Sequence, residues 1–234
     1  SELVKIHDGT YRAKDEGAFL RCEDRGVGGW EVRDKAGTRY RFGQTSASQL
    51  GHDGHVFQWA LDEVIDLNGN SLTIAYVNNQ EQLYPVTIRY AAHEATRLAP
   101  ANQVDFVLED RPDAETSYRG GFPITTAKRL QAVEAKPLVD GHLVLARRYR
   151  LDYTASSRTG RSLLSTITQI GNDGVTSLPP VTLTYTQDHI IVADASGTRT
   201  YTSGGTLTHA ALANGTAVDY STNGQLVTVT APNG

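Results

Sequence analysis

Apolar and polar residues alternate with a period of two over much of this sequence. Segments 30–33 and 39–42 each alternate aromatic or aliphatic residues with Glu or Arg, and residues 34–37 between them have the composition of a turn. Successive side chains of a β-strand point to opposite faces of its sheet. The pattern therefore predicts a β-hairpin with an aromatic face and a charged face.

The same period recurs farther along the chain. The turn Asp66–Asn70 contains Asn-Gly, a dipeptide that tolerates positive φ. Helix signals are poor: residues 91–98 suit a turn or two of helix, and 161–170 are ambiguous. At typical strand lengths, roughly twelve to sixteen strands fit the chain. We therefore predict an all-β fold, an extended, curved, multi-stranded antiparallel sheet with few or no helices. Further alternating segments are 57–61, 72–76, 86–90, 104–108, 143–153 and 181–185.

The last segment, 194–234, differs in composition and contains an internal repeat. It is rich in Thr, Gly, Ala and Asn and short of large apolar residues. Each copy reads as a hairpin that cannot bury its own face, so neighbouring copies are expected to stack side by side. We predict a β-sheet segment 1–193 followed by two 19-residue hairpin repeats in 194–234. Tyr201, Gly205, Leu207, Asn214 and Gly215 recur 19 residues later as Tyr220, Gly224, Leu226, Asn233 and Gly234.

Charge and hydropathy exclude two classes of partner. The net charge is −4 and the pI is about 6.0, which argues against nucleic acid because phosphate binding needs a basic face. No run approaches the ~18 apolar residues of a membrane span. No signal peptide is recognisable at the start, and Ser1 and Gly234 look like cut points in a longer protein.

A few clusters of polar residues have the composition of metal sites. His52 and His55 flank Asp53-Gly54 and suit a metal ion, but no third ligand is identifiable, so a solvated loop is the preferred interpretation. Asp66–Asn70 lacks the Gly and Glu positions of a calcium loop and reads as a structural turn. The single cysteine, Cys22, is interpreted as a small buried hydrophobe.

Candidate catalytic and sugar-binding groups have simpler interpretations. The acid pairs Glu109–Asp110 and Asp113–Glu115 are expected to be solvated in a loop, and Arg147, Arg148 and Arg150 to form a surface stripe or to pair with strand acids. Gly26–Gly29 precedes a strand and reads as a hairpin connection. No nucleophile elbow, P-loop or zincin motif is present. We therefore predict no catalytic, cofactor-binding or metal-binding residue. An aromatic set is assigned to packing rather than to a sugar platform: Trp30, Tyr40, Phe42, Phe57 and Trp59.

Two sets of motifs carry a family resemblance. Upstream of residue 186 an ordered series of motifs runs through Gly29–Val32, Gly37–Gly43, Trp59–Tyr76, Val104–Asp113, Tyr149–Tyr153 and Ser162–Pro180. This series resembles SpvB-like proteins and the B components of bacterial toxin complexes. In 220–234, a Tyr strand, a Gly-centred turn, Leu-Val-Thr-Val-Thr and Pro-Asn-Gly resemble the YD or Rhs repeat, and the first copy departs from it with Ala213 where Pro is common.

The resemblance implies a function without chemistry of its own. It implies a structural segment of a secreted or cell-surface Rhs/YD-repeat protein, forming part of a β-shell that encloses or presents a toxin or effector domain. Its partners would be other segments of the same shell or the cargo, with self-association through sheet edges. No cofactor is implied. The residues leave two alternatives open: a cell-surface β-sandwich that binds carbohydrate or a partner protein, and a hydrolase built from scattered Asp, Glu and His.

Overall fold

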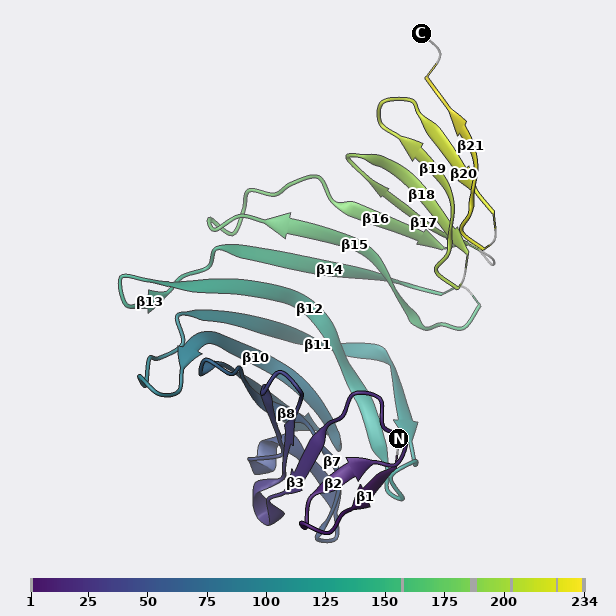
Figure 1. Ribbon diagram of the computed structural model, residues 1–234. Coiled ribbons are helices and arrows are strands. Elements are labelled where there is room, and N and C mark those ends of the chain that lie inside the picture. Colours follow the sequence, from purple (N-terminus) through teal and green to yellow (C-terminus); the bar gives the residue numbers. More distant parts are fainter. Residues whose placement is uncertain (1, 157, 186–188, 203, 222, 233–234) are drawn as a thin grey trace. The chain divides into compact units, whose positions relative to one another are not determined.

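The chain is built almost entirely from antiparallel β-strands. The computed structural model describes residues 2–156, 158–185, 189–202, 204–221 and 223–232. These residues contain strands β1 to β21 and two 3-10 turns, η1 (Gly26–Gly28) and η2 (Ser46–Ser48), but no α-helix (Figure 1). The predicted all-β class is confirmed. The chain forms two compact units, residues 1–146 and 147–234.

In the first unit the strands of the main sheet follow one another in sequence order. Each strand pairs with the previous and the next one, except that β5 pairs with β8 because β6 and β7 form a separate hairpin. The strands are β1 (Leu3–Lys5), β2 (Tyr11–Ala13), β3 (Arg21–Asp24), β4 (Trp30–Arg33), β5 (Arg39–Phe42), β6 (Gln49–His52), β7 (His55–Trp59), β8 (Leu61–Ile65), β9 (Asn70–Asn79), β10 (Gln82–His93), β11 (Asn102–Ser117), β12 (Ile124–Val139) and β13 (His142–Leu143).

The second unit is an uninterrupted meander. Every strand from β14 to β21 pairs antiparallel with its neighbour in sequence. Antiparallel neighbours can be joined by short turns, and in this unit the long connection is residues 171–180 between β15 and β16. The strands are β14 (Arg147–Ala155), β15 (Ser162–Ile170), β16 (Val181–Tyr185), β17 (His189–Asp194), β18 (Gly197–Thr202), β19 (Leu207–Leu212), β20 (Ala217–Tyr220) and β21 (Leu226–Thr230).

Several details of the predicted strand pattern were wrong. Strands are more numerous than expected because those of two to four residues are too short to show a period. The single strand expected over 143–153 is split, since β13 ends at Leu143 and β14 begins at Arg147. No helix forms over 91–98, where β10 runs to His93 and His93 pairs with Leu98 across a tight turn.

Cross-strand register gives the first unit one charged and one apolar face. Residues directly opposite each other in a sheet point to the same side. The two faces predicted for residues 30–42 are therefore confirmed, and they extend over several strands. The row on the charged face is Glu23, Glu31, Arg41, Glu63, Thr73, Arg89, Gln103 and Lys136, and the apolar row is Cys22, Val32, Tyr40, Val64, Leu72 and Tyr90.

The buried core of this unit is small. It lies where the β6–β7 region meets the apolar face, and Tyr76 packs against it. Among the described residues the largest side chains that are less than 2% exposed are those of Leu50, Ile65 and Ser48. Most of the apolar row is half-buried, so its side chains pack mainly against lateral neighbours on the sheet. The core cluster is Leu50, Ala60, Leu83, Phe122 and Ile124.

A tyrosine repairs an irregularity between the two longest strands. Opposite residues 111–114 of β11, strand β12 has only Ala127, so the regular ladder is interrupted there. The hydroxyl of Tyr84, a residue only 8% exposed, accepts hydrogen bonds from the backbone N–H groups of Ala127 (2.9 Å) and Lys128 (3.1 Å). Two donors that would otherwise lack a partner are thereby satisfied.

Tyr84→Phe is expected to lower the free energy of unfolding by about 1–2 kcal/mol, because buried donors left unsatisfied carry a desolvation cost. Denaturant titration followed by tryptophan fluorescence measures this. Tyr90→Phe, on the same strand but 40% exposed, is the matched control and should change stability by less than about 0.5 kcal/mol. Equal effects of the two substitutions would contradict the assignment.

Candidate functional site

A densely connected group of charged side chains lies on the charged face of the first unit. Strands β3, β4, β5 and β8 contribute to it, together with the turn after β10. At its centre is Glu31, of which only 8% is exposed. We call this group the Glu31 cluster; it comprises Glu23, Arg25, Glu31, Arg33, Arg39, Arg41, Glu63 and Glu94.

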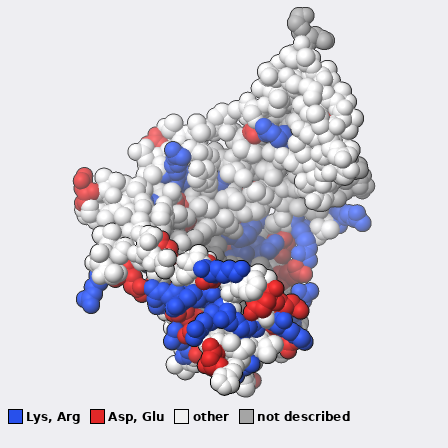
Figure 2. All heavy atoms as spheres, in the orientation of Figure 1, with Lys and Arg blue, Asp and Glu red and all other residues white. Residues whose placement is uncertain are grey.

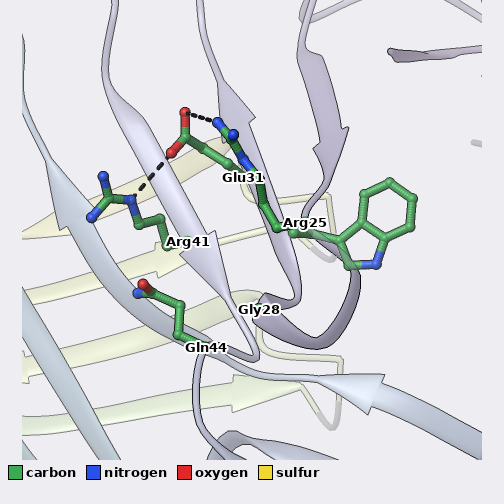
Figure 3. A pocket seen from close by; sticks show the side chains of 6 residues that line it. Arg25, Gly28, Glu31, Arg41 and Gln44 are labelled. Atoms are coloured by element: carbon green, nitrogen blue, oxygen red, sulfur yellow. Dashed lines mark hydrogen bonds and ion pairs between the residues drawn. The ribbon is translucent and has the colours of Figure 1, made fainter. Parts of the chain in front are cut away.

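Three arginines converge on the Glu31 carboxylate. Its Oε1 lies 3.3 Å from Nη2 of Arg25 and 3.4 Å from Nη2 of Arg33, and its Oε2 accepts a hydrogen bond from Nε of Arg41 at 3.2 Å. Figure 3 shows Glu31 between Arg25 and Arg41, joined to both. Such pairing is what makes a nearly buried carboxylate tolerable.

Arg41 links Glu31 to more distant parts of the chain. Its Nη1 donates to Glu63 at 2.8 Å, and its Nη2 lies 3.7 Å from Glu94. Glu94 also accepts a hydrogen bond from Arg39. The cluster thus ties β4, β5 and β8 to the turn after β10.

The environment of Glu31 favours its charged form. Burial alone would raise the pKa of the carboxyl group, but the hydrogen bond from Arg41 and the charges of Arg25, Arg41 and Arg33 outweigh it, so the pKa is lowered. For Arg41, burial opposes the charge, yet the hydrogen bonds to Glu31 and Glu63 raise its pKa. Both groups are therefore ionised at neutral pH.

A shallow pocket of about 320 Å³ opens beside the cluster, lined by Arg25, Gly28, Trp30, Glu31, Arg41 and Gln44. Its two arginines are engaged by carboxylates of the chain itself, and its one carboxylate, that of Glu31, is paired with both of them. In Figure 2 the acidic and basic side chains of the first unit intermingle on the visible face. The arrangement is suited to holding strands together rather than to binding an anion.

The histidines singled out in the sequence lie on the β6–β7 hairpin. His52 and His55 are direct cross-strand partners. The His52 ring stacks on Phe122 with centroids 5.1 Å apart, and its Nε2 lies 3.6 Å from Asp53. No group of three or more His, Cys, Asp or Glu side chains suited to a metal is found among the described residues. The expectation that they bind no metal stays a prediction.

The acid pairs Glu109–Asp110 and Asp113–Glu115 were expected in a loop, and this expectation is wrong: both pairs lie on strand β11. Glu109 pairs with Arg129 at 2.6 Å, and Asp110 pairs with Lys128 at 2.7 Å. These contacts bridge β11 and β12, because oppositely charged cross-strand neighbours attract. The pattern of alternation ended at Leu108 in the sequence, which is why the continuation of the strand was missed. Asp113, from the second pair, accepts from Arg111 at 2.8 Å.

Other predicted residues take structural positions. Trp30 makes edge-to-face contacts with Tyr11 and Trp59, at centroid distances of 5.1 and 6.1 Å, which favours packing over a sugar platform. Phe57 is 47% exposed, but its ring packs edge-on against Phe122. Cys22 is buried, as predicted, and burial raises the pKa of its thiol.

The remaining candidate residues from the sequence lie in strands or in the turns that connect them. Arg147, Arg148 and Arg150 lie on β14, where Arg150 pairs with Asp152 at 3.3 Å, one of the two alternatives expected. Residues 26–29 connect β3 to β4, as predicted for a hairpin connection. The turn Asp66–Asn70 joins β8 to β9, and the Asp66 carboxylate accepts from the backbone of Asn68 and Asn70.

The Glu31 cluster was not predicted as a unit. The alternation of apolar and polar residues placed Glu31, Arg33, Arg39 and Arg41 on one face, and this was the only feature of the sequence analysis that pointed to the cluster. It carried no information on Glu94, which lies 55 residues beyond Arg39.

Comparison with known proteins identifies the fold. No family model and no curated protein matches the chain. Within the described residues no helix is long and apolar enough to cross a membrane. The N-terminal domain of effector protein SpvB from Salmonella typhimurium strain LT2 superposes with a TM-score of 0.60 at 18% identity, over 69% of this chain and 68% of that chain.

Structures of toxin complexes are also similar to this chain in fold. The Photorhabdus luminescens Tc holotoxin pore matches with a TM-score of 0.64 at 13% identity, over 99% of this chain. TcdB2-TccC3-TEV matches with a TM-score of 0.61 at 14% identity, over 85% of this chain. The chain spans only 18% and 14% of those two chains. The similarity shows an SpvB- and Tc-like β-fold, and the resemblance noted in the sequence is confirmed at the level of the fold.

Proposed function

We propose that this chain is a non-catalytic structural segment of a secreted or surface bacterial protein, and that it forms part of a β-shell that encloses or presents a toxin or effector domain. The observation that carries the proposal is the likeness of the whole chain to part of a Tc toxin. The partners would be other segments of the same shell and the cargo. The chemistry of the parent protein would then reside outside these residues.

The side chains support this proposal. In the first unit, the charged groups of the Glu31 cluster pair with one another across strands, and the aromatic rings around Trp30 pack against one another. Lateral contacts of this kind stabilise a wall of strands, whereas catalysis needs groups that converge on a substrate. A sugar-binding platform would need aromatic faces open to solvent, which the edge-to-face contacts at Trp30 disfavour.

Protease protection of the cargo tests the proposal. The full-length product of the gene that encodes this chain is purified and digested with a nonspecific protease. We expect the toxin or effector domain to survive digestion in the wild-type protein. It should be degraded at least about tenfold faster when Gly29→Ala disrupts the wall, because cleavage tracks the population of open states.

Gly26→Ala, in the same turn, is the control for the substitution itself and should preserve protection. Equal digestion of the cargo in wild type and Gly29→Ala would refute enclosure. Hydrolytic activity retained by the isolated 234-residue chain would refute the structural assignment.

A further inference from the structure

Asp-Gly pairs occur in this chain in two kinds of turn. Asp53–Gly54 joins β6 to β7, and Asp140–Gly141 joins β12 to β13. In both pairs φ is positive at both residues, 49° and 80° in the first pair and 48° and 80° in the second, as a two-residue type I′ hairpin turn requires. Asp8–Gly9 and Asp173–Gly174 lie in longer connections, where the aspartate does not have a positive φ.

Hydrogen bonds hold both reactive groups of Asp8–Gly9. The N–H of Gly9 donates to the carbonyl of Ile6 at 3.0 Å. The Asp8 carboxylate accepts from the backbone N–H of Thr10 at 2.9 Å and from its hydroxyl at 2.7 Å. These bonds from Thr10 lower the pKa of Asp8, so its carboxylate stays ionised.

Asp173–Gly174 is held in the same way. The N–H of Gly174 donates to the carbonyl of Gly171 at 3.1 Å. The Asp173 carboxylate accepts from the backbone N–H groups of Val175 at 3.0 Å and Thr176 at 2.9 Å. Its pKa is lowered, first by the hydrogen bond from the Thr176 hydroxyl and then by those from the backbone.

The two hairpin turns lack these restraints. Among the described residues, the N–H groups of Gly54 and Gly141 have no acceptor, and the carboxylates of Asp53 and Asp140 accept no hydrogen bond. The Asp53 side chain is 86% exposed, and its Oδ1 lies 3.6 Å from Nε2 of His52, which is beyond hydrogen-bonding distance. Both the nitrogen and the carboxyl group of these two pairs are therefore free.

Asn-Gly pairs resemble the restrained turns. Gly69, Gly215 and Gly224 each donate their N–H to the carbonyl three residues earlier, at 3.1, 2.9 and 2.8 Å. Asn233–Gly234, which completes the repeat predicted from the sequence, lies outside the described residues. The two type I′ hairpin turns are thus set apart by structure and not by sequence.

We propose that Asp53–Gly54 and Asp140–Gly141 are sites at which aspartate converts spontaneously to isoaspartate, and that the fold protects Asp8–Gly9 and Asp173–Gly174 from the same reaction. The glycine nitrogen attacks Cγ of the neutral aspartate carboxyl group, so an N–Cγ bond forms and closes a five-membered succinimide ring. The amide proton and the side-chain hydroxyl leave together as water. A water molecule then adds to the former backbone carbonyl and breaks its bond to nitrogen, so the chain continues through the side chain and a free carboxyl group remains on Cα.

The observed hydrogen bonds oppose both requirements of this reaction. The nitrogen has to approach Cγ, so a glycine N–H held by a carbonyl across the turn must first be released. An ionised carboxylate is a poor electrophile, and backbone donors keep that of Asp8 and that of Asp173 ionised. Asp53 and Asp140 meet neither obstacle, and opening of a hairpin tip is among the least costly motions of a fold.

Conversion at Asp53 would disturb the buried core. Isoaspartate adds one atom to the backbone, so a two-residue turn no longer brings His52 opposite His55. The His52 ring stacks on Phe122 with centroids 5.1 Å apart, and Phe122 belongs to the core cluster. At Asp140 the turn leads only into the two exposed residues of β13, at the end of β12 (Figure 1). We therefore expect loosening of the β6–β7 hairpin after conversion at Asp53, and little structural effect at Asp140.

The test compares the folded chain with the unfolded chain. The 234-residue protein is kept for several weeks at neutral pH and physiological temperature, with and without denaturing urea. Isoaspartate is then located by peptide mapping with an isoaspartate-specific methyltransferase. In the folded chain we expect at least about tenfold more isoaspartate at Asp53 and Asp140 than at Asp8 and Asp173, because hydrogen bonds must break first at the latter two. In urea the four sites should react at similar rates, since each is followed by glycine.

Asp53→Glu and Asp140→Glu are the matched variants. They keep the charge, but a glutamate would have to close a six-membered ring, which is much slower. Each substitution should abolish isoaspartate at its own site alone. After ageing, hydrogen exchange in β6–β7 should be faster in the wild type and in Asp140→Glu, and unchanged in Asp53→Glu.

Equal isoaspartate at all four sites of the folded chain would overturn the proposal, because the motif and not the structure would then decide. An Asp53 that stays unmodified in the folded chain while the unfolded chain reacts would overturn it as well. Unaltered exchange in β6–β7 of the aged wild type would refute the loosening of the hairpin. None of these results depends on enclosure of a cargo, so this proposal and the proposed function can fail separately.

Discussion

Gly29→Ala is expected to lower the free energy of unfolding of the first unit by at least about 3 kcal/mol, because backbone strain and steric overlap combine at this site. Gly29 has φ of 74° and ψ of −136°, a combination open essentially to glycine alone. A Cβ atom there would lie 1.9 Å from the carbonyl oxygen of Phe42 and 2.8 Å from the carbonyl carbon of Gly43. Those atoms belong to the backbone, so relief requires shifting β5 against β4.

Soluble yield and the midpoint of denaturant unfolding, followed by Trp30 and Trp59 fluorescence, measure this effect. Gly26→Ala is the control in the same turn. Gly26 also has a positive φ, of 62°, but a Cβ there meets nothing within 4 Å. It should cost about 1–2 kcal/mol, the strain of a left-handed alanine. A Gly29→Ala protein as stable as Gly26→Ala would disprove close approach of the two strands.

These two glycines illustrate the limit of sequence reasoning about this fold. The run Gly26–Gly29 predicted a hairpin connection correctly, because a glycine-rich stretch before a strand is a local signal. Which glycine is indispensable depends on where the carbonyl of Phe42 lies, and that is decided by pairing of β4 with β5. Local composition carries no information on this contact.

The charged and apolar faces were predictable for a related reason. Side-chain direction in a strand follows from parity alone, so the alternation in segments 30–33 and 39–42 was enough to predict both faces. Burial did not follow from parity. Glu31 belongs to the polar set yet is more buried than Val32 on the opposite face, because arginines from two flanking segments and from its own strand cover it. The sequence also did not predict that β6 and β7 leave the main sheet as a separate hairpin. The alternation of apolar and polar residues continues through Ala60, from β7 into β8, and so gives no sign of the change of sheet.

Glu31→Gln is expected to lower the free energy of unfolding by about 2–3 kcal/mol at pH 7, since Arg25, Arg33 and Arg41 all lose the one nearly buried carboxylate they share, although Arg25 and Arg41 keep other carboxylate partners. Gln has nearly the shape of Glu but no charge for Arg25, Arg33 and Arg41. Glu23→Gln is the matched control: Glu23 lies directly opposite Glu31 on β3 and pairs with half-exposed arginines. Its loss should cost less than about 1 kcal/mol. Urea unfolding of the three proteins gives both values.

The pH dependence separates charge from packing. Because the pKa of Glu31 is lowered in the folded protein, its ionic contribution is complete above the unfolded-state pKa of about 4.3. It is lost as the pH falls through the folded-state value, where the carboxylate becomes protonated. The stability difference between wild type and Glu31→Gln should therefore be largest at pH 7 and shrink progressively below about pH 4.3. A difference that stays constant down to the onset of acid unfolding would mean that Glu31 acts through its shape, and that the arginines around it are held by other groups.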